Sequence, residues 1–161
     1  MDFTVDTAEE LAVTDSALGE LLVEVYVGGG FTQPEEAHSI FDPLAVRQRG
    51  VIFAARSNLN MELAGMIVFV PPGSRARKIA SGDSCEFHLM GVRKKYRRFG
   101  LGRRLVERAI SAAASSGCSG IVLWTQEAMA EAQALYESLG FSRGESFHRN
   151  GRNFYLYTKE L

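Results

Sequence analysis

The chain of 161 residues has little cysteine and no long apolar run, and each shortage excludes a class of protein. Two cysteines, Cys85 and Cys118, are too few for a disulfide framework and lack the spacing of a metal site. The longest apolar run is Met66–Val70, whereas a membrane-spanning helix needs about 20 apolar residues. The first residues, MDFTVD, contain no basic segment and no apolar core, so we expect no signal peptide. We therefore expect a cytoplasmic protein with reduced thiols and no membrane partner.

Basic residues are also missing from the N-terminal part of the chain, where no lysine or arginine precedes Arg47. Acidic residues fill that part, although the net charge of the whole chain is only −1. By contrast, residues 93–104 (RKKYRRFGLGRR) hold seven cations. Such a block needs an anionic partner or a large solvated face.

The hydrophobic pattern predicts one α/β domain over residues 1–161 with a mixed central sheet. A helix is expected from Asp15 to Tyr26 and a short second helix from Pro34, interrupted at Asp42-Pro43. Asn150-Gly151 predicts a terminal hairpin. The other expected elements are weak strand signals in 3–13, strands at 51–55, 61–70, 85–92, 121–125, 143–149 and 152–160, and helices at 101–113 and 128–139.

The basic block separates an apolar strand, residues 85–92, from a helix that begins near Gly100. A helix N-terminus presents unpaired N–H groups, and the glycines at 100 and 102 let a ligand approach that backbone closely. The segment lacks the Gly-Lys-Ser/Thr of a P-loop and the third glycine of a dinucleotide fingerprint. It therefore predicts a site for a multiply phosphorylated ligand, with a solvated basic helix start as the alternative.

Two motifs together resemble those of the GCN5-related N-acetyltransferase (GNAT) family. Residues 97–102 (RRFGLG) resemble its Q/R-x-x-G-x-G/A pyrophosphate loop. Residues 132–141 (AQALYESLGF) resemble its A-x-x-L-Y-x-x-L-G-F signature, in the family's order and at its usual separation. The resemblance implies a single-domain GNAT fold with helices on both faces of the sheet and two central strands, 85–92 and 121–125, that splay apart around acetyl-CoA.

The resemblance also implies which residues contact acetyl-CoA, with no metal required. The edge of strand 85–92 would pair with the pantetheine amides, and the backbone of residues 98–103 would hold the pyrophosphate. Many members carry an asparagine seven residues before the signature tyrosine, but here that position is Met129, so the asparagine's role is not carried over. The predicted contacts are Met90, Gly91, Val92, Arg97, Arg98, Phe99, Gly100, Leu101, Gly102, Arg103, Met129 and Tyr136.

Two catalytic roles follow from the resemblance. Tyr136 stands where the family keeps a tyrosine that protonates the departing thiolate, and a phenol with a pKa of about 10 holds its proton at neutral pH. Glu86 stands where histone-type members place a catalytic glutamate that deprotonates the amine. His88, two residues along the strand, and bulk water are the alternatives for the base. A strand bulge typical of the family would change which face each side chain takes. The structural alternatives are a core aromatic for Tyr136, an acid paired with an arginine for Glu86 and a hydrogen-bonded or exposed histidine for His88.

The sequence therefore predicts an N-acetyltransferase that moves an acetyl group directly from acetyl-CoA to a primary amine of a small molecule or peptide. The acceptor is expected beside Tyr26, Gly30 and Phe31, where an acidic rim would favour cationic amines unless it is ordinary solvated surface. We expect a monomer or homodimer. The alternatives are a CoA-binding module without turnover and, less favoured because no basic face continues elsewhere, a nucleic-acid-binding protein.

Overall fold

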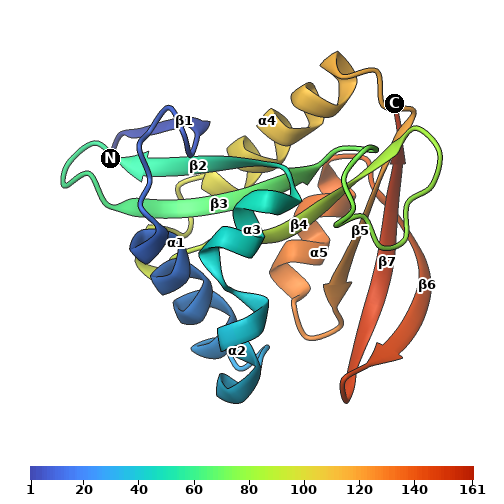
Figure 1. The fold of residues 1–161 in the computed structure, drawn as a ribbon, viewed down its shortest axis with the longest axis horizontal. Coiled ribbons are helices and arrows are strands. Elements are labelled where there is room, and N and C mark those ends of the chain that lie inside the picture. The colour runs from blue at the N-terminus through green and yellow to red at the C-terminus, as the bar shows by residue number, and fades with distance from the viewer.

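The computed structural model describes all of residues 1–161 as a seven-stranded sheet covered by helices on both faces (Figure 1). The strand order is β1-β2-β3-β4-β5-β7-β6. The strands are β1 (Phe3–Thr7), β2 (Val51–Ser57), β3 (Leu63–Val70), β4 (Ser84–Val92), β5 (Gly120–Gln126), β6 (Ser142–Arg149) and β7 (Arg152–Glu160). The helices are α1 (Asp15–Leu22), η1 (Val23–Val27), α2 (Pro34–Ile40), α3 (Pro43–Arg49), η2 (Lys94–Tyr96), α4 (Leu101–Ser115) and α5 (Ala130–Ser138).

The centre of the sheet is open on one side because β4 and β5 pair over a short stretch only. They are the one parallel pair, and their register runs from Ser84 opposite Gly120 to Glu86 opposite Val122. Beyond Glu86 the edge of β4 that faces β5 has no strand partner. The expected mixed sheet with two splayed central strands is confirmed.

Two separate apolar clusters lie on the two faces of the sheet. One contains the buried stripe of α1 and η1, with Leu18, Leu22 and Val25, packed on β2 and β3. The other contains the apolar face of α4 together with Tyr136 of α5 and Phe141. The alternation of side chains along each strand therefore separates an α1–α3 face from an α4–α5 face.

Local capping explains where the first helices begin. The Thr14 side chain accepts a hydrogen bond from the Ala17 N–H at the start of α1. Asp42-Pro43, which we expected only to interrupt a helix, also starts α3, because the Asp42 carboxylate caps it and proline is tolerated in the first turn. The strand signals in residues 3–13 extend only to Thr7, where turns begin.

Both cysteines are free and buried. Burial, together with the neighbouring Cys118, raises the pKa of the Cys85 thiol to about 12. None of the helices combines the length and the apolar character that a transmembrane span requires.

Candidate active site

A β-bulge in β4 decides which side chains face each layer. His88 pairs with Val68 and Gly91 with Met66, so two residues of β4, Leu89 and Met90, face a single residue of β3. Leu89 takes a left-handed conformation with φ 54°. As a result Leu89 packs with the α1–α3 cluster and Met90 with the α4–α5 cluster. Without the bulge, alternation would keep Met90 on the same face as His88.

The first of two clefts, which we call the glycine cleft, has a volume of about 620 Å³ and lies between the end of β4 and the starts of α4 and α5. Gly100 caps α4 in a left-handed conformation, φ 75°, and brings no capping side chain. The first N–H groups of α4 thus have no partner within the helix. The cleft is lined by Val25, Phe31, Met90, Gly91, Val92, Tyr96, Arg97, Arg98, Gly100, Leu101, Gly102, Arg103, Ala128, Met129, Ala130, Glu131, Ala132 and Leu135.

Ten of the twelve residues predicted to contact acetyl-CoA line this cleft, and Phe99 and Tyr136 do not. Phe99 is 46% exposed and its ring lies 5.7 Å from that of Phe3, away from the cleft. A Cβ at Gly102 would come within 3.1 Å of Leu135, so this glycine also sets the close approach of α4 to α5. The glycines therefore leave room for a ligand at a crowded helix start.

The basic block divides between structural ion pairs and the cleft. Arg93 and Lys95 both reach Glu62, at 3.4 Å and 2.6 Å. Arg97 instead borders the glycine cleft, where its Nε donates to the Val92 carbonyl at 3.0 Å, and Arg103 donates to the Ser138 hydroxyl at 2.8 Å. The cations of residues 93–104 therefore do not form one continuous basic surface.

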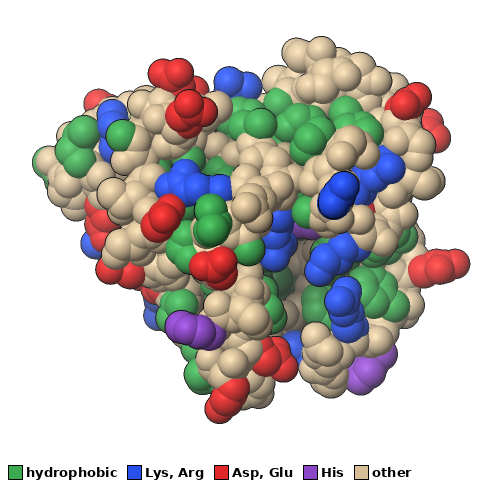
Figure 2. Space-filling view, viewed as in Figure 1, with side chains coloured by type: hydrophobic (Ala, Val, Ile, Leu, Met, Phe, Trp, Pro, Cys, Tyr) green, Lys and Arg blue, Asp and Glu red, His purple; other side chains and the backbone are tan.

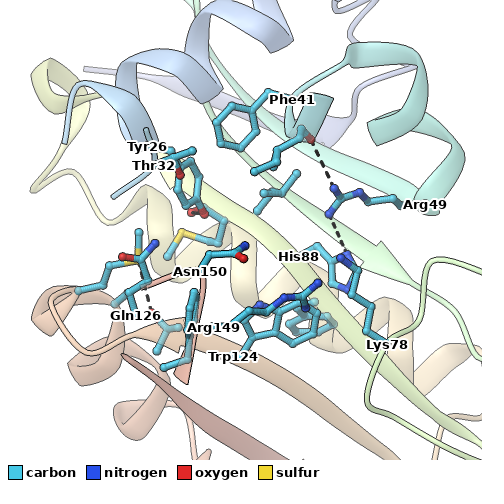
Figure 3. Close-up of a pocket in the computed structure, with 18 of the residues that line it drawn as sticks. Tyr26, Thr32, Phe41, Arg49, Lys78, His88, Trp124, Gln126, Arg149 and Asn150 are labelled. Atoms are coloured by element: carbon cyan, nitrogen blue, oxygen red, sulfur yellow. Dashed lines mark hydrogen bonds between the residues drawn. The ribbon is translucent and has the colours of Figure 1, made fainter. Parts of the chain in front are cut away.

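The second cleft, which we call the aromatic pocket, has a volume of about 420 Å³ and opens on the α1–α3 side, between α2 and the β6–β7 hairpin (Figure 3). Met90, Met129 and Ala132 line both clefts, so the two meet at the bulge of β4. The lining consists of Tyr26, Thr32, Ser39, Ile40, Phe41, Arg49, Lys78, Phe87, His88, Leu89, Met90, Trp124, Thr125, Gln126, Met129, Ala132, Tyr136, Arg149, Asn150 and Phe154.

The three residues predicted to contact the acceptor separate in the structure. Tyr26 lines the aromatic pocket, Phe31 lines the glycine cleft, and Gly30 lines neither. Two hydrogen bonds hold the loop that carries them: Gln126 Nε2 donates to the Phe31 carbonyl at 2.7 Å, and Arg152 donates to the Gly30 carbonyl at 2.9 Å. This loop therefore lies between the two clefts and is tied to β5 and β7.

Two tyrosines approach the junction of the clefts. The Tyr26 hydroxyl donates to the Met90 carbonyl at 2.9 Å. Tyr136 is 5% exposed, and burial, with a smaller contribution from Tyr26, raises the pKa of its phenol. Both phenols therefore keep their protons across the physiological pH range.

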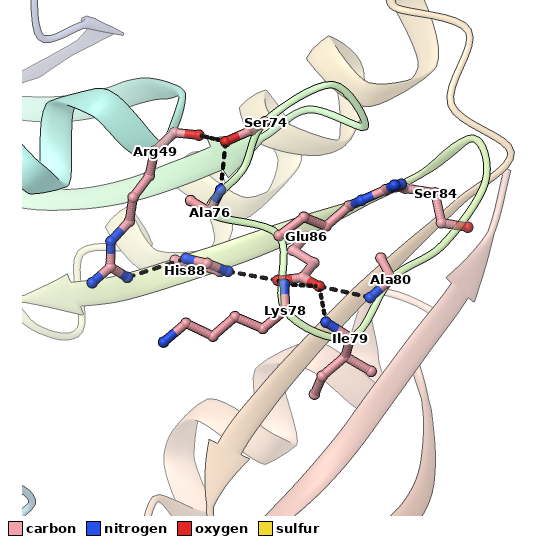
Figure 4. A network of polar contacts seen from close by, with 10 residues as sticks. Arg49, Ser74, Ala76, Lys78, Ile79, Ala80, Ser84, Glu86 and His88 are labelled. Atoms are coloured by element: carbon pink, nitrogen blue, oxygen red, sulfur yellow. Dashed lines mark hydrogen bonds and ion pairs between the residues drawn. The ribbon is translucent and has the colours of Figure 1, made fainter.

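Glu86 is fully buried beneath the aromatic pocket and does not line it (Figure 4). Its carboxylate accepts the backbone N–H groups of Lys78, Ile79 and Ala80 at 2.5–2.9 Å, and lies 2.8 Å from His88 Nε2. Burial alone raises the pKa of this carboxyl, but the hydrogen bonds from His88 and the backbone outweigh it and lower the pKa to about 2.

His88 connects that buried carboxylate to the pocket. Its Nδ1 lies 3.1 Å from an N–H of Arg49, which only donates, so Nδ1 accepts and Nε2 donates to Glu86. Burial lowers the pKa of His88 despite the contact with Glu86, and the nearby Arg49 lowers it further. Alternation along β4 puts Glu86 and His88 on the same face, but only the fold shows that His88 is the member of the pair that lines the pocket.

Acidic residues of the N-terminal part do not reach the aromatic pocket, whose lining contains no aspartate or glutamate. Asp15 pairs with Arg47 at 2.7 Å, Glu24 with Arg93 at 3.2 Å, and Asp42 caps α3. The hypothesis of an acidic rim that selects cationic acceptors gains no support from these positions.

Comparison with known proteins matches this chain to acetyltransferases. The profile of the acetyltransferase (GNAT) family matches residues 16–141. N-alpha-acetyltransferase 30 of Xenopus laevis is 41% identical over 61 residues, 38% of this chain and 22% of that protein. Mycothiol acetyltransferase of Thermobispora bispora is 32% identical over 116 residues, 68% of this chain and 38% of that protein. The chain thus spans less than half the length of either curated relative.

Solved structures match the whole fold at lower sequence identity. The crystal structure of a Bacillus subtilis acetyltransferase in complex with CoA has a TM-score of 0.69 and 20% identity, and the match covers 99% of both chains. Residues 16–141 include every residue that lines the glycine cleft, whereas the aromatic pocket also uses Arg149, Asn150 and Phe154. The family match thus covers all of the first cleft and part of the second.

Proposed function

The chain belongs to the GNAT acetyltransferase family, and from that premise we propose that it transfers the acetyl group of acetyl-CoA directly to a primary amine. The observation that carries the proposal is the meeting of two clefts at Met90, one at the glycine-flanked start of α4 and the other among aromatic and basic side chains. The donor occupies the glycine cleft, the amine enters through the aromatic pocket, and the two react at the bulge of β4. Residues 1–161 act as one catalytic domain.

The glycine cleft suits acetyl-CoA in both its parts. The edge of β4 from Met90 to Val92 has no strand partner on the β5 side and is available to the pantetheine amides, although side chains of Tyr26 and Arg97 donate to its Met90 and Val92 carbonyls. The uncapped start of α4, with Arg97 and Arg98 beside it, offers N–H groups and positive charge for the pyrophosphate. Met129 contributes apolar contact where many relatives of this family carry an asparagine.

Transfer needs an acid for the leaving thiolate, and Tyr136 has the required properties. The attacking amine adds to the thioester carbonyl, and a backbone N–H near Met90 stabilises the oxyanion. Collapse breaks the C–S bond, and Tyr136 gives its proton to the CoA sulfur. The phenol holds its proton at neutral pH, and because burial raises its pKa, it gives that proton up only as the negative charge develops on the sulfur beside it.

The amine also loses a proton, and the prediction that Glu86 accepts it remains untested. Four hydrogen bonds and a pKa of about 2 favour a structural role for Glu86: it anchors residues 78–80 and fixes the tautomer of His88. His88 lines the pocket and is neutral at pH 7. Its Nδ1 accepts the amine proton once the hydrogen bond that Arg49 donates to Nδ1 is broken. Bulk water is the other route for this proton.

Tyr136→Phe tests the proposal because it keeps the ring in place and removes the proton. With chemistry as the slow step, we expect turnover to fall about 10²–10⁴-fold with CoA affinity unchanged. Thiol release against a panel of primary amines measures turnover, and calorimetry measures CoA binding. Tyr155→Phe, on β7 and outside both clefts, is the matched control.

Three outcomes separate this function from its alternatives. Wild-type turnover in Tyr136→Phe would reject the acid role. CoA binding without thiol release for any amine would support a CoA-binding module instead. Salt-sensitive binding of RNA or DNA would support the nucleic-acid alternative, which the ion pairs of Arg93 and Lys95 with Glu62 disfavour. The cytoplasmic location and the monomeric or dimeric state stay predictions.

A further inference from the structure

We propose that the aromatic pocket selects a small amine that also carries an anionic group, a carboxylate or a phosphate, bound by Arg49, Lys78 and Arg149. This inference deepens the proposed function, since it assumes that the aromatic pocket is where the acceptor binds. It reverses the expectation of a cationic acceptor that the acidic N-terminal part of the sequence suggested.

Three cations from distant segments line this pocket together (Figure 3). Arg49 ends α3, Lys78 lies in the loop between β3 and β4, and Arg149 ends β6. No carboxylate lines the pocket, and none of the three cations forms an ion pair. Figure 2 shows lysine and arginine side chains bordering the hollow on this face of the molecule.

The three positive charges oppose one another in the absence of a ligand. Partial burial lowers the pKa of Lys78, and the nearby Arg149 and Arg49 lower it further. The pKa of Arg49 is also lowered, chiefly by burial. The buried carboxylate of Glu86 already accepts hydrogen bonds from His88 and three backbone N–H groups. An anion in the pocket would relieve this repulsion and gain charge-assisted hydrogen bonds.

The other residues that line the pocket indicate the size and the aromatic character of the rest of the ligand. Phe41, Phe87, Trp124 and Phe154 supply aromatic surface, and the Trp124 ring lies 4.9 Å from the ring of His88. The volume of about 420 Å³ lies within the range of small-molecule sites. Figure 3 shows Arg49, Lys78 and His88 at one end and Tyr26 and Gln126 at the other. The anion therefore sits at the Arg49 end beside His88 and the amine is directed toward Met90, so the amine proton reaches His88 Nδ1 through water.

Trp124 gives a test that requires no turnover, because it is the sole tryptophan of the chain and lines this pocket. At a saturating concentration of CoA, the fluorescence of Trp124 is measured while 3-phenylpropionate, phenylphosphonate or the neutral 3-phenylpropionamide is added. We expect at least one anion to bind about tenfold or more tightly than the amide, the gain of one charge-assisted hydrogen bond of about 1.5 kcal/mol. The stronger anion identifies a carboxylate or a phosphate as the preferred group.

Variants assign the effect to named cations. Lys78→Gln and Arg149→Gln should each remove most of the preference for the anion; the backbone N–H of residue 78 that holds Glu86 is unaffected by the change of side chain. Arg143→Gln is the matched control, because Arg143 lies on the same strand but outside the pocket. Equal affinity for anion and amide in the wild type, no response to any probe, or an undiminished preference in both variants would overturn the proposal.

Kinetics with matched amines separates this inference from the proposed function. Amino carboxylates are compared with their carboxamides by kcat/KM for thiol release, and we expect a preference of about tenfold or more for the acids. Equal rates would overturn the anion preference and leave the acetyltransferase intact. Thiol release by no amine, beside an intact anion preference in the Trp124 titration, would reject the proposed function and leave the anion site standing.

Discussion

The glycine cleft and the aromatic pocket meet at Met90 but are built in opposite ways. The lining of the first comes mostly from three short segments within 90–92, 96–103 and 128–135, where glycines and a helix start expose the backbone, with Val25 and Phe31 in addition. The second uses side chains from η1, α2, α3, β4, β5, α5, β6 and β7. A ligand held by backbone leaves a local motif, whereas one held by side chains from many elements leaves none.

The distribution of charge shows the same difference. The cations of the glycine cleft belong to one block, residues 93–104, that is visible in the sequence. Those of the aromatic pocket stand at positions 49, 78 and 149 and come together only in the fold. Of the acidic residues in the N-terminal part, Asp42 caps a helix, and Asp15 and Glu24 form ion pairs with other arginines. Net charge along a sequence therefore predicts the charge of a pocket poorly.

Among the variants that distinguish the two clefts, Gly102→Val is expected to have the largest effect on binding. The added side chain crowds the start of α4 and Leu135, so backbone N–H groups no longer reach the pyrophosphate. Losing two charge-assisted hydrogen bonds of about 1.5 kcal/mol each predicts about hundredfold weaker CoA binding by calorimetry. Trp124 emission in the aromatic pocket should change little.

Gly73→Val controls for the substitution itself. Gly73 lies in the loop after β3, and nothing lies within 4 Å of an added Cβ. If Gly102→Val is folded by circular dichroism and binds CoA as tightly as the wild type, the donor does not occupy the glycine cleft.

Glu86→Gln comes next and tests whether this carboxylate supports the pocket or takes part in the reaction. The pKa of Glu86 is lowered from 4.5 to about 2, which corresponds to about 3 kcal/mol of stability above pH 4.5. The wild type loses that contribution as pH falls from 4.5 toward 2. The variant lacks it throughout, so we expect a lower melting temperature and a flatter pH dependence in that window.

A pH–rate series on the same variant completes this comparison. Because Glu86 raises the pKa of His88, we expect the acid limb of the Glu86→Gln profile to move to lower pH, whereas His88→Gln should lose activity near neutrality and recover at high pH, where the amine is already deprotonated. Glu145→Gln, at an exposed position of β6, is the stability control. A wild-type melting curve together with a loss of activity near neutrality that recovers at high pH in Glu86→Gln would restore Glu86 as the base.

The smallest effect is expected where the two clefts share a boundary. Arg152→Gln removes one exposed hydrogen bond to the Gly30 carbonyl, in the loop that carries Phe31 and Thr32. A bond of this kind is worth about 0.5–1.5 kcal/mol, so the KM values for donor and acceptor should rise together by about twofold to tenfold. A change in one KM alone would show that the loop serves a single cleft.

Local signals in the sequence predicted the elements that carry local chemistry. The β6–β7 hairpin forms at Asn150-Gly151, and Asn150 has the positive φ, 51°, that such a turn requires. The glycine cleft followed from the spacing of Gly100 and Gly102. The missed helix α3 had a signal in Asp42-Pro43, which is as typical of a helix start as of a break.

Residues brought together by tertiary contacts could not be predicted in the same way. Arg49 ends the missed helix, Lys78 lies in a loop without periodic pattern, and Arg149 ends a hairpin strand. Which of Glu86 and His88 faces the ligand depends on the loop that folds its N–H groups onto Glu86. The sequence of β4 itself does not predict where that loop lies.

The burial of both cysteines has a practical consequence for chromogenic thiol detection. Disulfide reagents react with thiolates, and burial both shields Cys85 and raises its pKa to about 12. In the native protein these reagents should report the CoA released during turnover with little background from the chain. Without substrate, the slow rate at which the reagents label Cys85 and Cys118 measures how often the sheet opens beside β4 and β5.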